Sequence, residues 1–152
     1  MKLGVLKEPE GETRVAIVPT SLKKLQKAGF EVVIEAGAGT AANYHDAEYE
    51  AAGATVGTRD DALACETIIT IRFPGVEGMK EGTNLACVSD PFRNPQFVKD
   101  CLASNITLLS MDMIPRRLSR AQSMDVNSSQ DNLAGYKACL LYTSPSPRDN
   151  TG

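Results

Sequence analysis

The sequence is poor in the residues that build metal centres, disulfide frameworks and aromatic cores. Among its 152 residues there is no tryptophan and one histidine, and aromatic side chains make up 5%. The four cysteines, Cys65, Cys87, Cys101 and Cys139, are far apart and form no Cys-x-x-Cys pair. We therefore predict neither a metal site nor a disulfide framework. The core has to be built from Val, Ile, Leu and Ala, which is typical of buried parallel sheets.

Long apolar runs and blocks of one charge are also missing. Runs such as 67–71 are far shorter than the ~20 residues of a membrane-spanning helix, and no charged-then-apolar signal segment opens the chain. Sixteen Lys and Arg oppose 19 Asp and Glu, so the net charge is -3 and no basic block could neutralise a run of phosphates. These absences predict a soluble, cytosolic protein without a nucleic-acid partner.

Short apolar segments alternate with segments of helical periodicity along most of the chain. The composition, 42% hydrophobic and 23% charged, is that of a globular domain. In the first helical segment, Thr20 or Ser21 is the expected N-cap and Gly29 the stop. We expect strands at 2–6, 30–34, 54–56, 67–71, 84–88 and 106–109, and helices at 20–28, 46–52, 60–64, 96–103 and 133–138. This order predicts an α/β fold, a Rossmann-like or flavodoxin-like parallel sheet with helices on both faces.

The pattern changes after residue 138. The eleven residues from Cys139 to Asp149 resemble, codon for codon, the in-frame translation of a transposase adapter used in sequencing-library preparation. The alternative is a native tail rich in Pro and Ser. We expect residues 1–138 to be the native part of an incomplete subunit and 139–152 to be an adapter-derived tail that fold reasoning should leave out.

One glycine-rich segment fits a loose nucleotide-binding pattern. Residues 37–42 read G-A-G-T-A-A after an expected strand, and Asp60 and Asp61 follow at roughly the spacing of the ribose-binding acid. The expected helix starts only near Asp46, however, whereas a phosphate-binding loop runs directly into a helix N-terminus. An ordinary turn between a strand and a helix is the favoured interpretation.

Two isolated polar residues each allow a functional and a structural interpretation. His45 could shuttle a proton, but no nucleophile or second base accompanies it, so a solvated loop histidine is favoured. Arg14 could clamp a carboxylate or phosphate with two hydrogen bonds. It could equally form a surface ion pair with Glu12 or Glu10.

The strongest polar cluster occupies residues 115–132, directly after the last expected strand, where ligands bind in open α/β sheets. Its Arg, Gln, Asp and Ser side chains suit an amide such as a nicotinamide carboxamide, together with a phosphate. The alternative is a hydrophilic loop in which Ser128 or Ser129 caps the next helix. Asp112, Asp125 and Asp131 are candidate acids or bases, but no paired-carboxylate spacing marks them.

Several motifs together resemble one family. They are GVLKE at 4–8, TRVAIVP at 13–19, EAGAG at 35–39, AAGA at 51–54, SRAQSMD at 119–125 and NLAGYKA at 132–138. The chain is similar over its 138 native residues to the N-terminal part of the NAD(H)-binding α subunit of proton-translocating NAD(P) transhydrogenase. Alanine dehydrogenase is a related family that shares the early R-V-A-x-x-P.

The resemblance implies a first Rossmann-like subdomain that closes over a second, with NAD(H) between them. The family's glycine fingerprint then lies beyond residue 138, and residues 37–42 are not the nucleotide site. The family's nicotinamide-side loop maps onto Gln122, Asp125 and Ser128, with Gln122 and Asp125 positioning the hydride. Its arginine is either Arg116 or Arg117, because two arginines stand here where the family usually has one.

The implied activity is hydride transfer between NADH and NADP+, coupled to proton translocation. The implied enzyme is the Re/Si-specific transhydrogenase, and this truncated chain alone would be inactive. Its expected partners are a membrane-embedded subunit, an NADP(H)-binding domain and a second α subunit. The expected location is cytoplasmic, peripheral to the inner face of the bacterial cytoplasmic membrane.

Two alternatives stay open. The first is an NAD-dependent enzyme like alanine dehydrogenase, but the substrate lysine of that family is missing from the strand that contains Thr70 and Arg72. Its catalytic histidine is missing near 90–92. The second alternative is a non-catalytic module that packs against other subunits.

Overall fold

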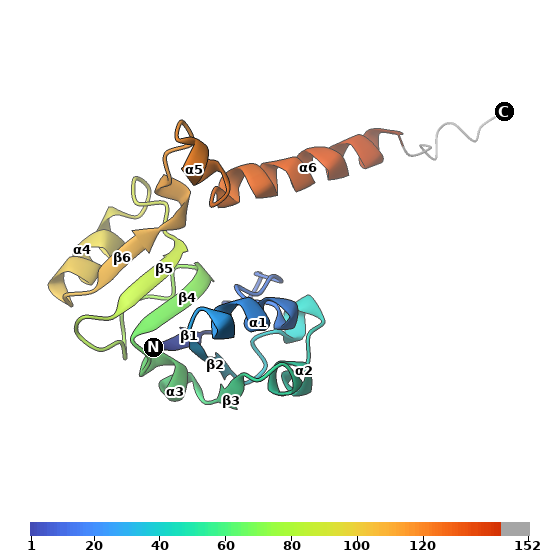
Figure 1. Cartoon of the computed structure of the whole chain (residues 1–152). Helices are drawn as coiled ribbons and strands as arrows, with labels where there is room; N and C mark the ends of the chain where they lie inside the picture. Colours follow the sequence, from blue (N-terminus) through green and yellow to red (C-terminus); the bar gives the residue numbers. More distant parts are fainter. Residues whose placement is uncertain (144–152) are drawn as a thin grey trace. The chain divides into compact units, whose positions relative to one another are not determined.

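A six-stranded parallel sheet forms the first of two units, residues 1–113, in the computed structural model, which describes residues 1–143 (Figure 1). The strand order is β3-β2-β1-β4-β5-β6. The strands are β1 (Lys2–Val5), β2 (Glu31–Glu35), β3 (Thr55–Gly57), β4 (Thr67–Arg72), β5 (Asn84–Val88) and β6 (Thr107–Ser110). Each predicted strand is present within two residues of its expected bounds.

Four helices connect and cover the strands. They are α1 (Pro19–Lys27), α2 (Asp46–Ala51), α3 (Arg59–Leu63) and α4 (Pro95–Ala103), with single 3-10 turns η1 (Thr40–Ala42) and η2 (Met111–Met113). α1 and α2 pack on one face of the sheet, and α3 and α4 pack on the other. The chain starts in the middle of the sheet, builds outward to β3 and then crosses to β4, which is the doubly wound Rossmann order. The predicted fold class is confirmed.

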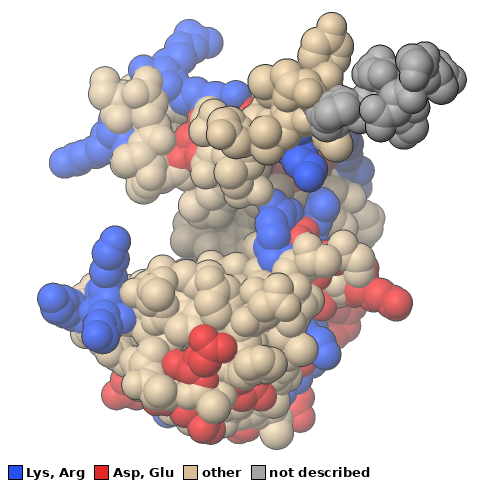
Figure 2. Space-filling model, turned by 90° about the vertical axis from the view of Figure 1, so that its right-hand side faces the viewer, with Lys and Arg blue, Asp and Glu red and all other residues tan. Residues whose placement is uncertain are grey.

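Charged side chains of both signs lie on the surface. On the face shown in Figure 2, blue side chains stand in separate groups and most of the red ones lie on the lower part, with wide uncharged areas between them.

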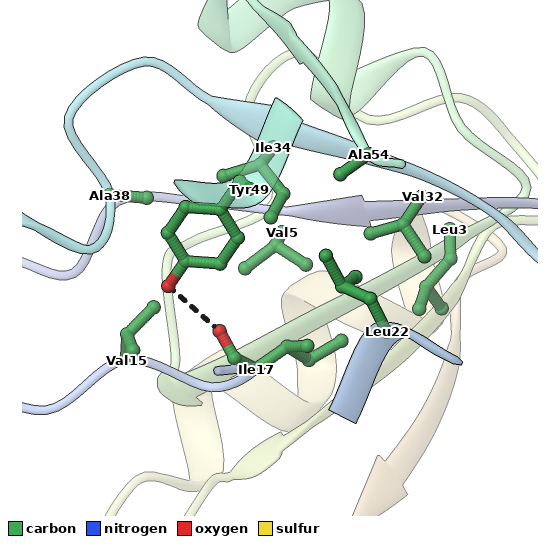
Figure 3. Packing of buried hydrophobic residues seen from close by; sticks show 10 residues of the cluster. All are labelled: Leu3, Val5, Val15, Ile17, Leu22, Val32, Ile34, Ala38, Tyr49 and Ala54. Carbon is green, nitrogen blue, oxygen red and sulfur yellow. Dashed lines mark hydrogen bonds between the residues drawn. The ribbon is translucent and has the colours of Figure 1, made fainter. Parts of the chain in front are cut away.

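The first core lies under α1 and α2 (Figure 3). Its centre is formed by Val5, Ile34 and Leu22, which are fully buried. Tyr49 is buried beside them, and its hydroxyl donates a hydrogen bond of 3.0 Å to the carbonyl oxygen of Ile17. The phenol thus satisfies its polar group and ties α2 to the long connection before α1.

The second core lies on the opposite face, under α3 and α4. It contains Ile68 and Leu85 of neighbouring strands together with Cys87, all fully buried. Burial raises the pKa of the Cys87 thiol to about 12. α3 approaches β1 so closely that a Cβ at Gly4 would collide with the carbonyl oxygen of Ala62. Glycine is therefore required at this strand position.

Burial decreases along one row of residues across the first face. The row runs through Ile34, Val5, Ile69, Ala86 and Leu109, which are paired in register from β2 to β6. Its first two members are fully buried, the next two are partly buried, and Leu109 is 50% exposed. Within residues 1–113, the helices of this face cover only the β1–β3 half, because right-handed crossovers place the later helices on the other side.

The predicted start of the first helix is wrong. α1 begins at Pro19 with Val18 as its N-cap, not at Thr20 or Ser21. Proline is favoured at the first helical position because its fixed φ suits the helix and its missing N–H needs no partner there.

The second unit starts at Ile114 and contains α5 (Ser119–Gln122) and α6 (Val126–Thr143). Neither Ser128 nor Ser129 is the N-cap of α6, because the helix already begins at Val126. The pattern change at Cys139 does not end the helix, which continues to Thr143. The rest of the expected tail lies outside the described residues. Within residues 1–143, no helix is long and apolar enough to cross a membrane.

The burial pattern predicts a strong contrast between two leucines. We expect Leu85→Ala to lower the free energy of unfolding by about 2–5 kcal/mol, because it leaves a cavity in the second core. Leu109→Ala, at a half-exposed edge position, is the matched control and should cost less than about 1 kcal/mol. Urea denaturation followed by circular dichroism measures both. Equal losses would contradict the burial gradient.

Candidate functional site

The polar loop before α6 is organised around one carboxylate. Asp125 precedes the first residue of α6, and its Oδ1 accepts hydrogen bonds from the backbone N–H groups of Asn127 (3.0 Å) and Ser128 (3.1 Å). Its Oδ2 accepts the hydroxyl of Ser128 at 2.6 Å. This is helix N-capping, so Asp125 takes the role that the sequence alternative gave to a serine.

The Asp125 carboxyl is held in its charged form. The hydrogen bond from the Ser128 hydroxyl lowers its pKa most, and the Ser128 N–H and the Arg116 guanidinium add to the effect. The positive end of the α6 dipole also favours a negative charge at this position. A carboxylate in this setting holds no proton to donate at neutral pH, so the structure does not favour Asp125 as a general acid.

The two neighbouring arginines differ in their contacts. Arg116 Nε lies 3.2 Å from Asp125 Oδ2, and Arg116 Nη2 lies 3.9 Å from Asp131 Oδ2. Arg117 is exposed and makes no hydrogen bond or ion pair with any of residues 1–143. The side chain of Gln122, at the end of α5, is likewise exposed and without a partner in this part of the chain. The loop thus offers a guanidinium and an amide to a ligand.

The glycine-rich segment after β2 is already occupied by the chain itself. The N–H of Gly37 donates to both carboxylate oxygens of Asp46, at 2.9 and 3.1 Å. A Cβ at Gly39 would lie 2.6 Å from the ring of Tyr49, so this glycine permits packing in the core. A carboxylate where a phosphate would bind repels an anion, which supports the ordinary-turn interpretation of residues 37–42.

His45 lies in the same segment and is exposed. It is the residue before α2, and its N–H donates to Oε1 of Glu48 at 2.9 Å. This contact belongs to helix capping, in agreement with the favoured interpretation of a solvated loop histidine.

A charged cluster joins the connection after β1 to the end of β4. Arg14 forms two hydrogen bonds to Glu12, from Nε at 2.8 Å and Nη2 at 2.7 Å, so the ion-pair interpretation of Arg14 is confirmed with Glu12 as partner. Arg72 Nε approaches the same carboxylate at 3.2 Å. Glu8 accepts the N–H groups of Ile71 and Arg72, and burial raises its pKa.

Sequence reasoning missed the contribution of Glu8 because its partners lie more than 60 residues away, and no local pattern reveals such a contact. The cluster borders a cavity of about 430 Å³. Its lining residues are Pro9, Glu10, Gly11, Glu12, Arg72 and Phe73.

Asp112, another candidate acid or base, is occupied by structural bonds. It accepts the N–H groups of Ser89 (3.1 Å) and Asp90 (3.0 Å) and the hydroxyl of Ser110 (2.8 Å). These bonds tie the ends of β5 and β6 together and lower its pKa against the effect of burial. Asp131 Oδ2 lies 3.9 Å from Nη2 of Arg116, and the Asp131 side chain is 75% exposed. Asp112 thus joins two strand ends, and Asp131 forms a surface ion pair.

The sheet order and the layers of helices define a Rossmann-like α/β domain. The family model of the alanine dehydrogenase/PNT N-terminal domain matches residues 4–134. The chain therefore belongs to this family.

Transhydrogenases are prominent among its relatives. The NAD(P) transhydrogenase subunit alpha of Cereibacter sphaeroides is 40% identical over 146 residues, which is 92% of this chain and 28% of the relative. The crystal structure of the transhydrogenase from Sinorhizobium meliloti superposes with a TM-score of 0.88 at 41% identity, covering 92% of this chain and 43% of that one. The chain thus spans less than half the length of either protein.

Alanine dehydrogenases match less of the chain. The enzyme of Geobacillus stearothermophilus is 40% identical over 77 residues, which is 49% of this chain and 21% of the relative. The similarity to the transhydrogenase subunit covers nearly twice as much of the chain.

The contacts in the charged cluster predict a low pKa for Glu12. The Arg14 hydrogen bonds lower the pKa of Glu12 from the usual 4.5 to about 2. The stabilisation from this carboxylate is therefore complete above pH 4.5 and is lost as the pH falls from 4.5 towards 2. We expect Arg14→Gln to raise the Glu12 midpoint towards 4.5, measured by NMR titration of the carboxyl carbon. Arg93→Gln, which removes an exposed arginine elsewhere, should leave it unchanged, and an equal shift in both variants would contradict the assignment.

Proposed function

We propose that the complete subunit containing this chain binds NAD(H) and positions it for hydride transfer to NADP+ in a proton-translocating transhydrogenase. The observation that carries the proposal is the loop of residues 114–128. In it the Asp125 carboxylate caps α6 and fixes the backbone, and the side chains of Arg117 and Gln122 have no partner among residues 1–143. The family membership and the long similarity to transhydrogenase α subunits support it. The sequence similarity to alanine dehydrogenase is shorter, and no histidine stands near 90–92, where that family's catalytic histidine is expected.

The residues of the loop fit a nicotinamide nucleotide. The primary amide of Gln122 has both a donor and an acceptor, which matches the carboxamide of nicotinamide. The guanidinium of Arg117 suits a phosphate or a second amide oxygen. Asp125 and Ser128 are bonded to each other and keep the start of α6 in place.

The bound nicotinamide supplies the hydride-transfer chemistry, and the protein supplies orientation and the exclusion of water. Transfer between two nicotinamides needs no general base. The arrangement in the loop agrees with this requirement, because its buried carboxylate is committed to hydrogen bonds and an ion pair. The work of the site is to hold one ring in a reactive orientation, which contributes to rate by proximity.

The same proposal includes the partners and the boundaries of the subunit. NADP(H) would bind on a partner domain, a membrane-embedded subunit would carry the protons, and two α subunits would pair. The stereospecificity would be Re/Si, and the chain as given would be inactive.

We propose residues 1–138 as the native domain and 139–152 as the adapter-derived tail. The family match ends at residue 134, before the tail begins, which supports this boundary.

The function can be tested on the complete subunit, read from its gene past codon 138. We expect NADH to bind it, measured by the change in nucleotide fluorescence on titration. Adding the NADP(H)-binding partner domain should allow reduction of NADP+ by NADH. Reductive amination of pyruvate without any partner would instead indicate an amino-acid dehydrogenase, and absence of NADH binding to the complete subunit would refute the proposal.

Gln122 provides the sharpest single test of the site. We expect Gln122→Ala to slow hydride transfer by about tenfold to a hundredfold, because the ring loses an orienting contact, while the Kd for NADH changes by less than about threefold. Stopped-flow transfer rates and NADH titrations measure the two quantities. Gln96→Ala, which removes an exposed glutamine paired only with Asp100 in α4, should change neither. An unchanged transfer rate in Gln122→Ala would remove the assignment.

A further inference from the structure

Arg116 and Arg117 are adjacent in the sequence but have different surroundings. Arg116 faces two carboxylates, Asp125 at 3.2 Å and Asp131 at 3.9 Å, whereas Arg117 contacts no partner among residues 1–143. One guanidinium is thus engaged within the protein and the other is available. The sequence left the choice open, because counting back from Gln122 favours Arg117 and adjacency to Pro115 favours Arg116.

The contacts of Arg116 span the start of α6. Asp125 caps the helix, and Asp131 lies in its second turn. The Arg116 side chain is therefore paired both with the cap of α6 and with its second turn. The Asp125 side chain is only 5% exposed, and Arg116 is the only cation paired with it among residues 1–143. Arg116 adds an opposite charge to the two N–H groups and the hydroxyl that already bind this carboxylate.

Asp125 also connects this contact to Gln122. The N–H of Asp125 donates to the carbonyl oxygen of Gln122 at 3.5 Å, at the end of the short helix α5. This main-chain contact joins the residue that caps α6 to the residue that carries the amide. The cap and Gln122 are thus only three residues apart on one hydrogen-bonded turn.

We propose that Arg116 is a positioning residue that holds Asp125 and the first turn of α6 in place and thereby orients Gln122, while Arg117 is left to bind the cofactor. The inference rests on the proposed function, because it takes the loop as the cofactor loop. If Arg116 were the ligand arginine, it would have to leave both carboxylates on binding. The nearly buried Asp125 would then lose its cation, which is an unfavourable exchange.

The first test uses the 152-residue chain and no ligand. The amide protons of Asn127 and Ser128 report directly on the Asp125 cap, because both are bonded to its Oδ1. We expect Arg116→Met to make them exchange roughly two- to fivefold faster, which is the range of a modest ion pair. Arg116→Lys should restore part of the protection, and Arg117→Met is the matched control with no effect. The amide of Leu85 in β5 should exchange equally in every variant, showing that the sheet is intact.

Unchanged exchange at Asn127 and Ser128 in Arg116→Met would overturn the inference, as would an equal effect of Arg117→Met. The first result would show that Arg116 does not hold the cap. The second would show that the effect is not specific to Arg116.

The second test separates positioning from binding in the complete subunit with its NADP(H) partner. We expect Arg116→Met to keep the Kd for NADH within about twofold and to slow hydride transfer several-fold, with partial rescue by Arg116→Lys. Arg117→Met should instead weaken NADH binding about tenfold or more, as expected for a lost charge-assisted hydrogen bond. A large loss of NADH affinity in Arg116→Met would make Arg116 a ligand residue and refute the inference while the proposed function stands. Unchanged NADH affinity in Arg117→Met would contradict its assignment as the ligand arginine. The role of Arg116 in holding the Asp125 cap would then still be decided by the exchange rates of Asn127 and Ser128.

Discussion

Both faces of a parallel sheet have to be covered by other elements, and this constraint organises the first unit. Parallel strands require crossover connections, and right-handed crossovers place each helix on a face that depends on the direction of travel across the sheet. The chain winds outward from β1 to β3 and then from β4 to β6, so its two halves place their helices on opposite faces. Gly4 shows how tight the cover is, because its strand and α3 leave no space for a side chain. The same winding leaves the row that ends at Leu109 without a helix from residues 1–113.

Carboxylates that accept backbone N–H groups hold the connections between these elements. Asp46 binds Gly37, Glu8 binds the end of β4, Asp112 binds the turn after β5, and Asp125 binds the start of α6. Each bond satisfies donors that a turn or a helix start would otherwise leave unpaired. These acidic residues therefore serve the fold.

The limits of sequence reasoning follow from the range of the interactions. Alternation and apolar runs located all six strands, because burial on both faces leaves a strong local pattern. Helix starts were less predictable, because neighbouring Thr and Ser residues are good caps but do not cap these helices. α1 starts at Pro19 after Val18, and α6 is capped by Asp125. The resemblance mapped Gln122, Asp125 and Ser128, yet the choice between Arg116 and Arg117 depends on which guanidinium reaches the α6 carboxylates. The contact of Glu8 with β4 is longer in range still and has no sequence signal.

Hydride transfer between two nicotinamides places a particular demand on a protein. No proton has to be moved at the reacting carbons, so side chains contribute by fixing distance and angle rather than by donating or accepting protons. A loop that meets this demand should hold its acidic groups in internal bonds and leave directional donors for the ligand. Asp125 is bonded to both Arg116 and Ser128, whereas the Gln122 amide and the Arg117 guanidinium have no partner among residues 1–143. In the proposed function, rigidity at the start of α6 would orient the nicotinamide.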